Sequence, residues 1–292
     1  MGNYALLLAS LFAAACGTVA RKYYTDKSGN AARTKCIYTA TSCLVAALCL
    51  AAVGNMVRPS LFTVLLSLLF GTVTALQGIA LLMAMRLGPV SYSMMFSSFS
   101  TVITALSGVL FFGESITPLK IVGIALMLVS FVFAVERDRE GKRGNLLWLL
   151  LCIGVFLGTG GIGIMQKVHQ TSAYKAELDI FLVLSFIVTA AVSLLVFALL
   201  PRGEENPKPQ GRKVWLLLLL CTVGGGACVA INNKLNLFLS GVLEASVFFP
   251  IANGGAVVLS TLAAFFLFGE RLSYRRWIGL FIGVVSVILL CI

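Results

Sequence analysis

Long apolar runs alternate with short polar connections along the whole chain. Each of ten runs has 18 residues or more, at roughly 3–20, 36–57, 61–85, 90–112, 118–135, 145–166, 178–200, 214–238, 243–268 and 273–292. As helices rising 1.5 Å per residue, such runs are long enough to cross about 30 Å of hydrocarbon. The longest connections are too short to fold as soluble domains. The pattern predicts an all-α integral membrane protein with ten transmembrane helices.

The last two runs repeat an earlier pair. When the sequence is shifted by 156 positions, residues 102–135 align with 258–291 with 8 identities in 34 positions. The turn Gly113-Glu114 falls on Gly269-Glu270, and Gly123 falls on Gly279. A hairpin present twice at a fixed spacing indicates duplication.

Duplication of an odd number of helices constrains the topology. The chain divides into 1–136, a charged connector 137–144, and 145–292, with five predicted spans in each half. The second half then enters the membrane from the side opposite to the first. This parity predicts two inverted five-helix repeats, an architecture typical of transporters, whose substrate site lies where the repeats meet.

Composition agrees with this picture, because 59% of the residues are hydrophobic and 11% are charged. The eight cysteines lie mostly inside apolar runs and show no Cys-x-x-Cys spacing, so we interpret them as packing residues. The net charge of +11 comes from basic residues in short loops, which indicates membrane orientation rather than nucleic-acid binding.

The basic residues are distributed unequally between the two sides of the predicted membrane. Connections after odd-numbered spans, with their helix ends, hold 17 of the 22 Lys and Arg residues, and the opposite side holds 5. The positive-inside rule places the richer side in the cytoplasm and therefore both termini outside. The predicted location is the cytoplasmic membrane, crossed many times.

The two Gly-Glu turns, each followed by a glycine nine residues after the glutamate (Gly123, Gly279), resemble the ten-helix EamA-like form of the drug/metabolite transporter superfamily. Pro250 in the ninth span adds to the resemblance, which covers the whole chain. It implies ten helices that move small polar metabolites or drugs without ATP hydrolysis. Members of that family usually keep both termini in the cytoplasm, whereas the charge count favours the reverse. Met94 stands where the ninth span has Pro250, so we expect a kink in the ninth span only.

Matching polar stripes occur in the fourth and ninth spans. Ser93, Ser97, Ser100, Thr104 and Ser107 share one helix face. Small and hydroxyl-bearing residues suit close helix packing, which we favour for Ser100, Thr104 and Ser107. Ser97 and Asn253 are better candidates for contact with a cargo, since Asn253 lies one turn beyond Pro250, which frees a backbone carbonyl.

The eighth span carries the densest polar cluster: Asn232, Asn233, Lys234 and Asn236. Such groups are costly on an apolar helix unless they face protein or water, so these four are substrate-binding candidates. In the alternative, Lys234 extends to the interface while the asparagines bond to neighbouring helices. Gln77, in the third span, is a further candidate for the cavity.

The end of the sixth span holds Lys167 and His169, which are candidates for gating or coupling. His169 is the only histidine, and so the only side chain with an unperturbed pKa near neutrality. An interfacial position without a transport role is the competing interpretation. Glu114 and Glu270 are interpreted first as structural, each favouring a helix N-terminus.

No carboxylate is predicted in the middle of a span, and the deep charges, Lys167 and Lys234, are both positive. We therefore expect a secondary transporter or facilitator for a small polar metabolite that is neutral, zwitterionic or anionic, working by alternating access. The alternatives are a proton-coupled multidrug or metabolite exporter and a non-transporting structural or regulatory membrane protein. We expect no enzymatic activity, cofactor, metal or nucleic-acid partner. The expected partners are a small-molecule substrate and membrane lipid, and two halves in one chain allow a monomer.

Overall fold

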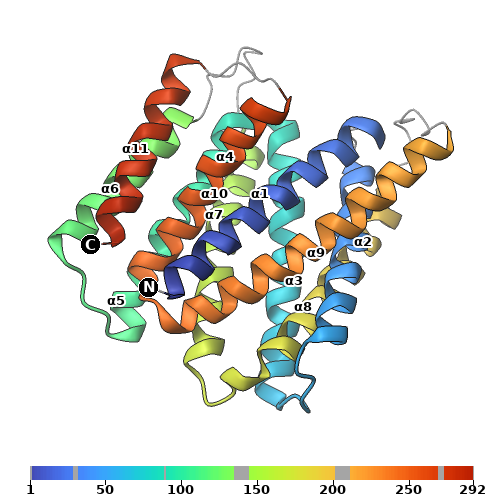
Figure 1. Ribbon diagram of the computed structural model, residues 1–292, viewed down its shortest axis with the longest axis horizontal. Helices are drawn as coiled ribbons and strands as arrows, with labels where there is room; N and C mark the ends of the chain where they lie inside the picture. The colour runs from blue at the N-terminus through green and yellow to red at the C-terminus, as the bar shows by residue number, and fades with distance from the viewer. Residues whose placement is uncertain are drawn as a thin grey trace. The chain divides into compact units, whose positions relative to one another are not determined.

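The computed structural model describes residues 2–28, 32–88, 90–134, 145–200, 211–268 and 273–291, and this part of the chain is helical without strands (Figure 1). The helices are α1 Gly2–Ser28, α2 Ala32–Val53, α3 Leu61–Leu87, α4 Val90–Phe99, α5 Thr101–Phe112, α6 Pro118–Ala134, α7 Leu146–Thr171, α8 Leu178–Leu199, α9 Arg212–Val242, α10 Ala245–Phe268 and α11 Tyr274–Cys291. A short 3₁₀ turn, Lys175–Glu177, precedes α8.

Eight helical segments in the described residues are long and apolar enough to cross a bilayer, with α4 and α5 contributing one joint segment, Tyr92–Phe112. The prediction of an all-helical, multi-pass membrane protein is confirmed. The other two predicted spans correspond to α6, which is a shorter apolar helix, and α11.

The fourth predicted span is interrupted at Ser100, between α4 and α5. The Ser100 hydroxyl donates to the Ser97 carbonyl at 2.6 Å, and the Ile103 N–H donates to the Ser100 carbonyl, three residues back, at 2.9 Å. Serine bonding to its own helix and three-residue bonds both tighten the backbone locally. The interruption at Ser100 was not predicted from the sequence; Pro250, where a kink was expected, lies inside the continuous helix α10.

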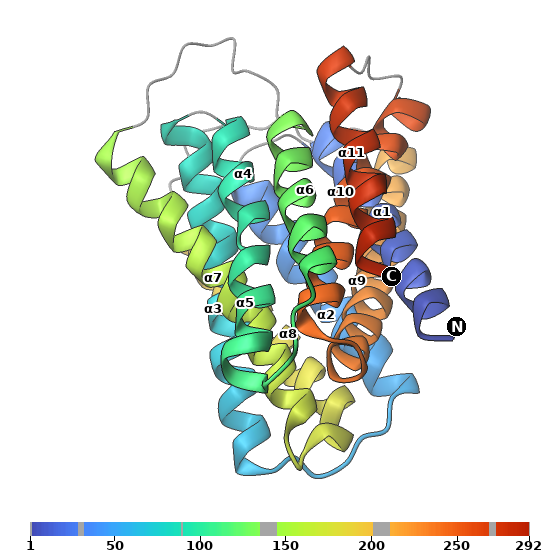
Figure 2. The same cartoon turned by 90° about the vertical axis from the view of Figure 1, so that its left-hand side faces the viewer.

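The helices form two compact units, each of which draws on both halves of the sequence: one comprises residues 1–3, 76–168 and 239–292, and the other residues 4–75 and 169–238. In the first unit α6 packs along α11, as Figure 2 shows. The Ser130 hydroxyl donates to the Gly279 carbonyl, and the Ser286 hydroxyl donates to the Gly123 carbonyl, both at 2.7 Å. These four residues are the pairs that the 156-residue shift aligns.

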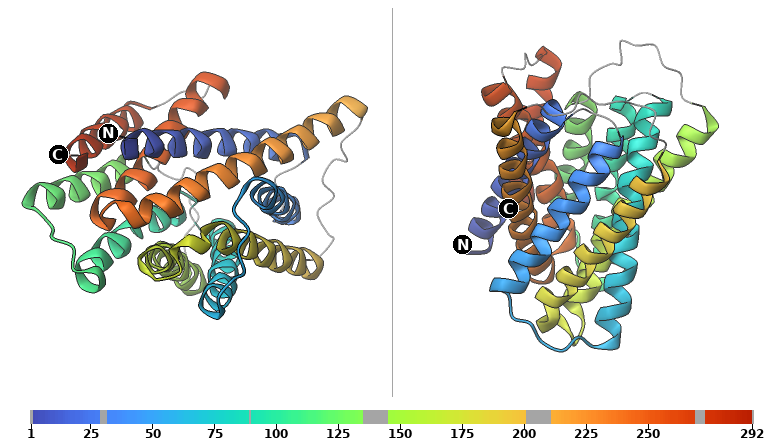
Figure 3. Two further views of the ribbon diagram at one scale, coloured as in Figure 1. Left: turned by 60° about the horizontal axis from the view of Figure 1, so that its bottom comes forward. Right: turned by 90° about the vertical axis from the view of Figure 1, so that its right-hand side faces the viewer.

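In the second unit α2 packs along α8 (Figure 3, right). Close approach of α3 to α8 requires Gly71, because a Cβ there would lie 2.6 Å from the Ser185 carbonyl oxygen. The Thr189 hydroxyl donates to the Gly71 carbonyl at 3.2 Å. Arg33 donates to the Leu200 carbonyl at the end of α8 and lies over the Phe197 ring.

Candidate functional site

A glycine-rich segment of α7 lies very close to neighbouring helices in the first unit. A Cβ at Gly158 would lie 3.2 Å from Gln77, one at Gly160 would lie 2.8 Å from Ile103, and one at Gly163 would lie 2.3 Å from Thr104. Small residues let membrane helices approach this closely. The backbone of α7 therefore lies against α3 and α5 in the middle part of α7.

Uncharged polar side chains lie along this contact. The Ser97 and Thr159 hydroxyl oxygens are 3.5 Å apart, and Thr159 also donates to the Val155 carbonyl at 2.8 Å. Gln77 is half-buried and its side chain packs against Gly158. At 1.5 Å per residue, Thr159 lies about 20 Å from the start of α7, near the middle of the helix.

Asn253 joins α10 to α5. Its amide nitrogen donates to the Thr101 hydroxyl oxygen at 2.8 Å, and Thr101 is buried while Asn253 is half-buried. The neighbouring residues Ser100, Thr104 and Ser107, for which close helix packing was predicted, are buried and donate to carbonyls three residues back in the chain. Asn253 differs from these three residues because its hydrogen-bond partner lies on another helix.

In the second unit Asn232 and Asn236 form a closed set of bonds with Ser10 of α1. The Ser10 hydroxyl donates to Asn236 Oδ1 at 2.5 Å, and the Asn236 amide donates to Asn232 Oδ1 at 3.3 Å. The Asn232 amide donates to the Ser10 carbonyl at 2.9 Å. Asn233 donates instead to its own helix, at the Val229 carbonyl, at 2.9 Å. The hydrogen bonds of Asn232 and Asn236 with Ser10 thus connect α9 to α1.

Lys234 is paired with Asp179, at the start of α8. Lys234 Nζ lies 2.7 Å from Asp179 Oδ1, an ion pair that lacks the alignment of a hydrogen bond. Asp179 Oδ2 accepts the Asn55 N–H at 2.8 Å. The Lys234 side chain is 40% exposed and that of Asp179 is 10% exposed, so the carboxylate is the more buried partner.

His169 is fully buried. Its ring stacks on Phe181 with centroids 4.3 Å apart, and its Nδ1 lies 3.0 Å from the Gln170 amide nitrogen. Within the described residues its Nε2 has no hydrogen-bond partner.

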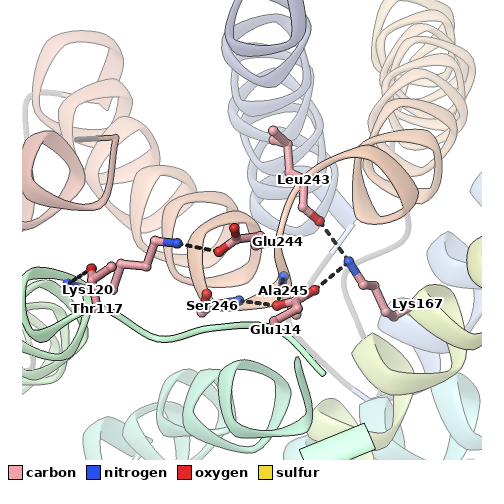
Figure 4. Close-up of polar contacts among 8 residues, drawn as sticks. All are labelled: Glu114, Thr117, Lys120, Lys167, Leu243, Glu244, Ala245 and Ser246. Atoms are coloured by element: carbon pink, nitrogen blue, oxygen red, sulfur yellow. Dashed lines mark hydrogen bonds and ion pairs between the residues drawn. The ribbon is translucent and has the colours of Figure 1, made fainter. Parts of the chain in front are cut away.

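Lys167 and Glu114 form a buried ion pair in the first unit (Figure 4). Lys167 Nζ lies 2.8 Å from Glu114 Oε1 and donates to the Leu243 carbonyl at 2.8 Å. Glu114 Oε2 accepts the Ala245 N–H at 2.7 Å and lies 3.4 Å from the Ser246 nitrogen. The carboxylate therefore satisfies the N-terminus of α10, not that of α6, the helix that follows it in sequence.

Gly113 positions Glu114 for this contact. It ends α5 in the left-handed region, with φ 65°, which favours glycine. The Glu114 N–H donates to the Gly108 carbonyl at 3.0 Å. The equivalent turn residues, Gly269 and Glu270, lie outside the described residues.

Lys167 and Lys234 thus each have a carboxylate partner, which the sequence did not predict. Each acid lies near a helix end far away in the sequence, where spacing alone gives no signal. The hydroxyls of Ser10, Thr101 and Thr159 were also missed, because each is a single small polar residue in an apolar run. In the described part of the chain no group of three or more His, Cys, Asp or Glu residues is placed to hold a metal ion.

Comparison with known proteins identifies the family. A profile described as "Sugar transport protein" matches residues 11–292. A Haemophilus influenzae protein described as uncharacterized is 23% identical over 189 residues, which are 62% of this chain, and the match spans only 60% of that protein. A solved crystal structure, described only as that of a protein, is 14% identical, covers 99% of this chain and 96% of its own, and superposes with a TM-score of 0.76, which shows a shared fold. Since the profile covers nearly all of the sequence, the chain belongs to the sugar transport protein family, a family of the drug/metabolite transporter type, as the two Gly-Glu turns had indicated.

Proposed function

We propose that the protein is a secondary transporter or facilitator that carries a small neutral polar metabolite, of the sugar class, across the cytoplasmic membrane. The observation that carries the proposal is a set of uncharged amides and hydroxyls that lie inside the candidate membrane spans of the first unit: Gln77, Ser97, Thr159, Thr101 and Asn253. Polar groups at this depth are costly in hydrocarbon and commonly mark a substrate pathway.

The charges at depth favour a neutral cargo within the classes that the sequence allowed. Lys167 and Lys234 are each balanced by a carboxylate, so neither presents an uncompensated positive charge to an anion. Amides and hydroxyls both donate and accept hydrogen bonds, as the hydroxyls of a sugar do. The printed description of the family points to the same class.

The proposed mechanism is alternating access between two inverted five-helix repeats, 1–136 and 145–292. The reciprocal serine-to-carbonyl bonds between α6 and α11 support it, because an interface with two-fold symmetry makes each contact twice. The packing of α2 with α8 and of α5 with α10 likewise joins segments that correspond in the two halves. We retain the orientation in which both termini are extracytoplasmic, because 17 of the 22 basic residues lie on the other side.

The four polar residues of the eighth predicted span, Asn232, Asn233, Lys234 and Asn236, differ in how readily they could contact a cargo. Among the described residues Asn233 bonds only to its own helix, so a modest side-chain rotation would present its amide to a cargo. Asn232, Asn236 and Lys234 would reach a cargo only after releasing Ser10 or Asp179. We therefore assign first contact to Gln77, Ser97 and Asn253.

The test is flux into liposomes that contain the purified protein, with radiolabelled D-glucose as the probe. We expect saturable uptake that is accelerated when unlabelled glucose is loaded inside. Liposomes without protein give the background. Robust exchange of a quaternary ammonium drug, with no saturable flux of any neutral sugar in a panel of pentoses and hexoses, would overturn the proposal.

The second candidate is a proton-coupled exporter, and the buried His169 favours it. A histidine nitrogen without a partner among the described residues is a potential proton acceptor. The same liposomes distinguish the two candidates, because an imposed pH gradient drives accumulation against a concentration gradient only in a proton-coupled protein. Exchange that is insensitive to the gradient leaves the facilitator.

A further inference from the structure

The junction of Figure 4 brings together helix ends that share one side of the membrane. Glu114 follows α5, Lys167 lies near the end of α7, and Leu243 and Glu244 connect α9 to α10. Alternate connections of a multi-pass chain lie on the same side, so all four belong to the side with only 5 of the 22 basic residues. We call this the charge-poor side.

Two ion pairs that differ in burial contact the connection between α9 and α10. The side chains of Lys167 and Glu114 are 6% and 10% exposed, and together they bind the Leu243 carbonyl and the Ala245 N–H. Lys120 on α6 pairs with Glu244, whose side chain is 44% exposed. Water screens the second pair, whereas breaking the first leaves a buried charge without its partner.

Ser246 could give Glu114 a different partner in a second conformation. It is fully buried, and in the described residues its hydroxyl has no hydrogen-bond partner, although its N–H points at Glu114 Oε2. One turn later Pro250 lacks the N–H that would bond to the Ser246 carbonyl, so the first turn of α10 has one bond fewer to hold it. A buried polar group without a partner calls for a physical reason, and a second conformation that uses it is one.

We propose that Glu114 and Lys167 form a latch that holds the charge-poor side closed, and that the Ser246 hydroxyl becomes the partner of Glu114 when Lys167 releases it. The inference rests on the proposed transport function and adds the residues that gate one side of it. Loss of the ion pair shifts the equilibrium towards opening on the charge-poor side. Loss of the Ser246 hydroxyl shifts it the other way.

The experiment measures how fast a membrane-impermeant maleimide labels one cysteine from the charge-poor side. The parent protein carries Ser97→Cys, with the eight native cysteines replaced by alanine or serine. Relative to this parent, we expect Lys167→Met and Glu114→Gln each to accelerate labelling at least ten-fold. The glutamine retains an oxygen that accepts the Ala245 N–H, so Glu114→Gln removes the charge with little loss of the helix contact and stands in if Lys167→Met does not fold.

Three further variants separate a latch from general loosening of the structure. Lys120→Met, the matched control, leaves the rate within two-fold, because the carboxylate that it leaves behind, Glu244, is 44% exposed and reaches water. The double variant Glu114→Gln/Lys167→Met labels no faster than either single variant, since both remove one interaction. Ser246→Ala slows labelling at least three-fold, which is opposite in sign to the lysine change.

If Lys167→Met and Glu114→Gln label like the parent, or if Lys120→Met labels as fast as they do, the latch is overturned. Unchanged or faster labelling of Ser246→Ala overturns the role of its hydroxyl. Glucose flux is measured separately on the native protein. Normal latch behaviour without sugar flux therefore refutes the proposed function and not the latch, and flux without latch behaviour does the reverse.

Discussion

The amide nitrogen of Asn253 donates to the hydroxyl oxygen of Thr101 across 2.8 Å, joining α10 to the first residue of α5. This bond begins one turn after Pro250 and ends next to Ser100, the residue between α4 and α5. One hydrogen bond between uncharged side chains therefore connects the segment after Pro250 in α10 to the junction of α4 and α5.

Asn253→Ala removes the donor and leaves the Thr101 hydroxyl in place. We expect the rate of glucose flux to fall at least ten-fold, while the free energy of unfolding falls by only about 1 kcal/mol, the usual size of one hydrogen bond between membrane helices. Flux in liposomes and thermal unfolding in detergent measure the two effects. Ser260→Ala is the control, because in the part of the chain that the structure describes Ser260 bonds only to its own helix. Parallel loss of folding and flux would assign Asn253 to packing.

The hydrogen bond between Ser10 and Asn236 predicts energetic coupling between α1 and α9. We expect Ser10→Ala and Asn236→Ala each to destabilise the protein, and the double variant to lose less than the sum of the two. The interaction energy should be about 0.5–2 kcal/mol, as for residues in one hydrogen-bond network. Thermal unfolding of the four proteins provides the cycle. Strict additivity would contradict the bond.

Gly160 and Gly161 are adjacent in α7 and face different surroundings. A Cβ at Gly160 would lie 2.8 Å from Ile103, whereas a Cβ at Gly161 would meet nothing within 4 Å. Because the β-branched Ile103 has little rotamer freedom, we expect Gly160→Ala to cost about 1–3 kcal/mol and to reduce flux. Gly161→Ala should leave both within error. Equal effects of the two substitutions would show that α7 does not make this close approach.

The pair Lys234 and Asp179 predicts an order of variants. Lys234→Met leaves a carboxylate that is 10% exposed, whereas Asp179→Asn leaves a lysine that is 40% exposed and within reach of water. The asparagine can still accept the Asn55 N–H. We therefore expect Lys234→Met to lower the melting temperature more than Asp179→Asn does, and the double variant to recover part of that loss, because the cost lies in the buried, unpaired charge. The reverse order would contradict the pairing.

The parts of this structure that sequence could predict are those that repeat a local pattern. Apolar runs predicted the helices, and the 156-residue register brought together Ser130, Ser286, Gly123 and Gly279 in the right pairs. The break at Ser100 was missed, because proline is a stronger local signal than a serine that bonds back to its own helix. The partners of Lys167 and Lys234 were missed because Glu114 and Asp179 lie 53 and 55 residues away, and their roles depend on helix packing that no local spacing encodes.

The α6–α11 interface allows the repeat to be tested by energetics. Ser130 donates to the Gly279 carbonyl and Ser286 to the Gly123 carbonyl, at the same distance of 2.7 Å, and both serines are buried. If one symmetric contact is made twice, Ser130→Ala and Ser286→Ala should destabilise the protein equally, by about 0.6–1.7 kcal/mol each. Chemical unfolding in detergent measures both, and Ser260→Ala gives the cost of removing a hydroxyl that bonds only to its own helix. A difference of more than about 1 kcal/mol between the two serines would mean that the interface no longer retains the symmetry of the duplication, since equivalent bonds in equivalent surroundings must contribute alike.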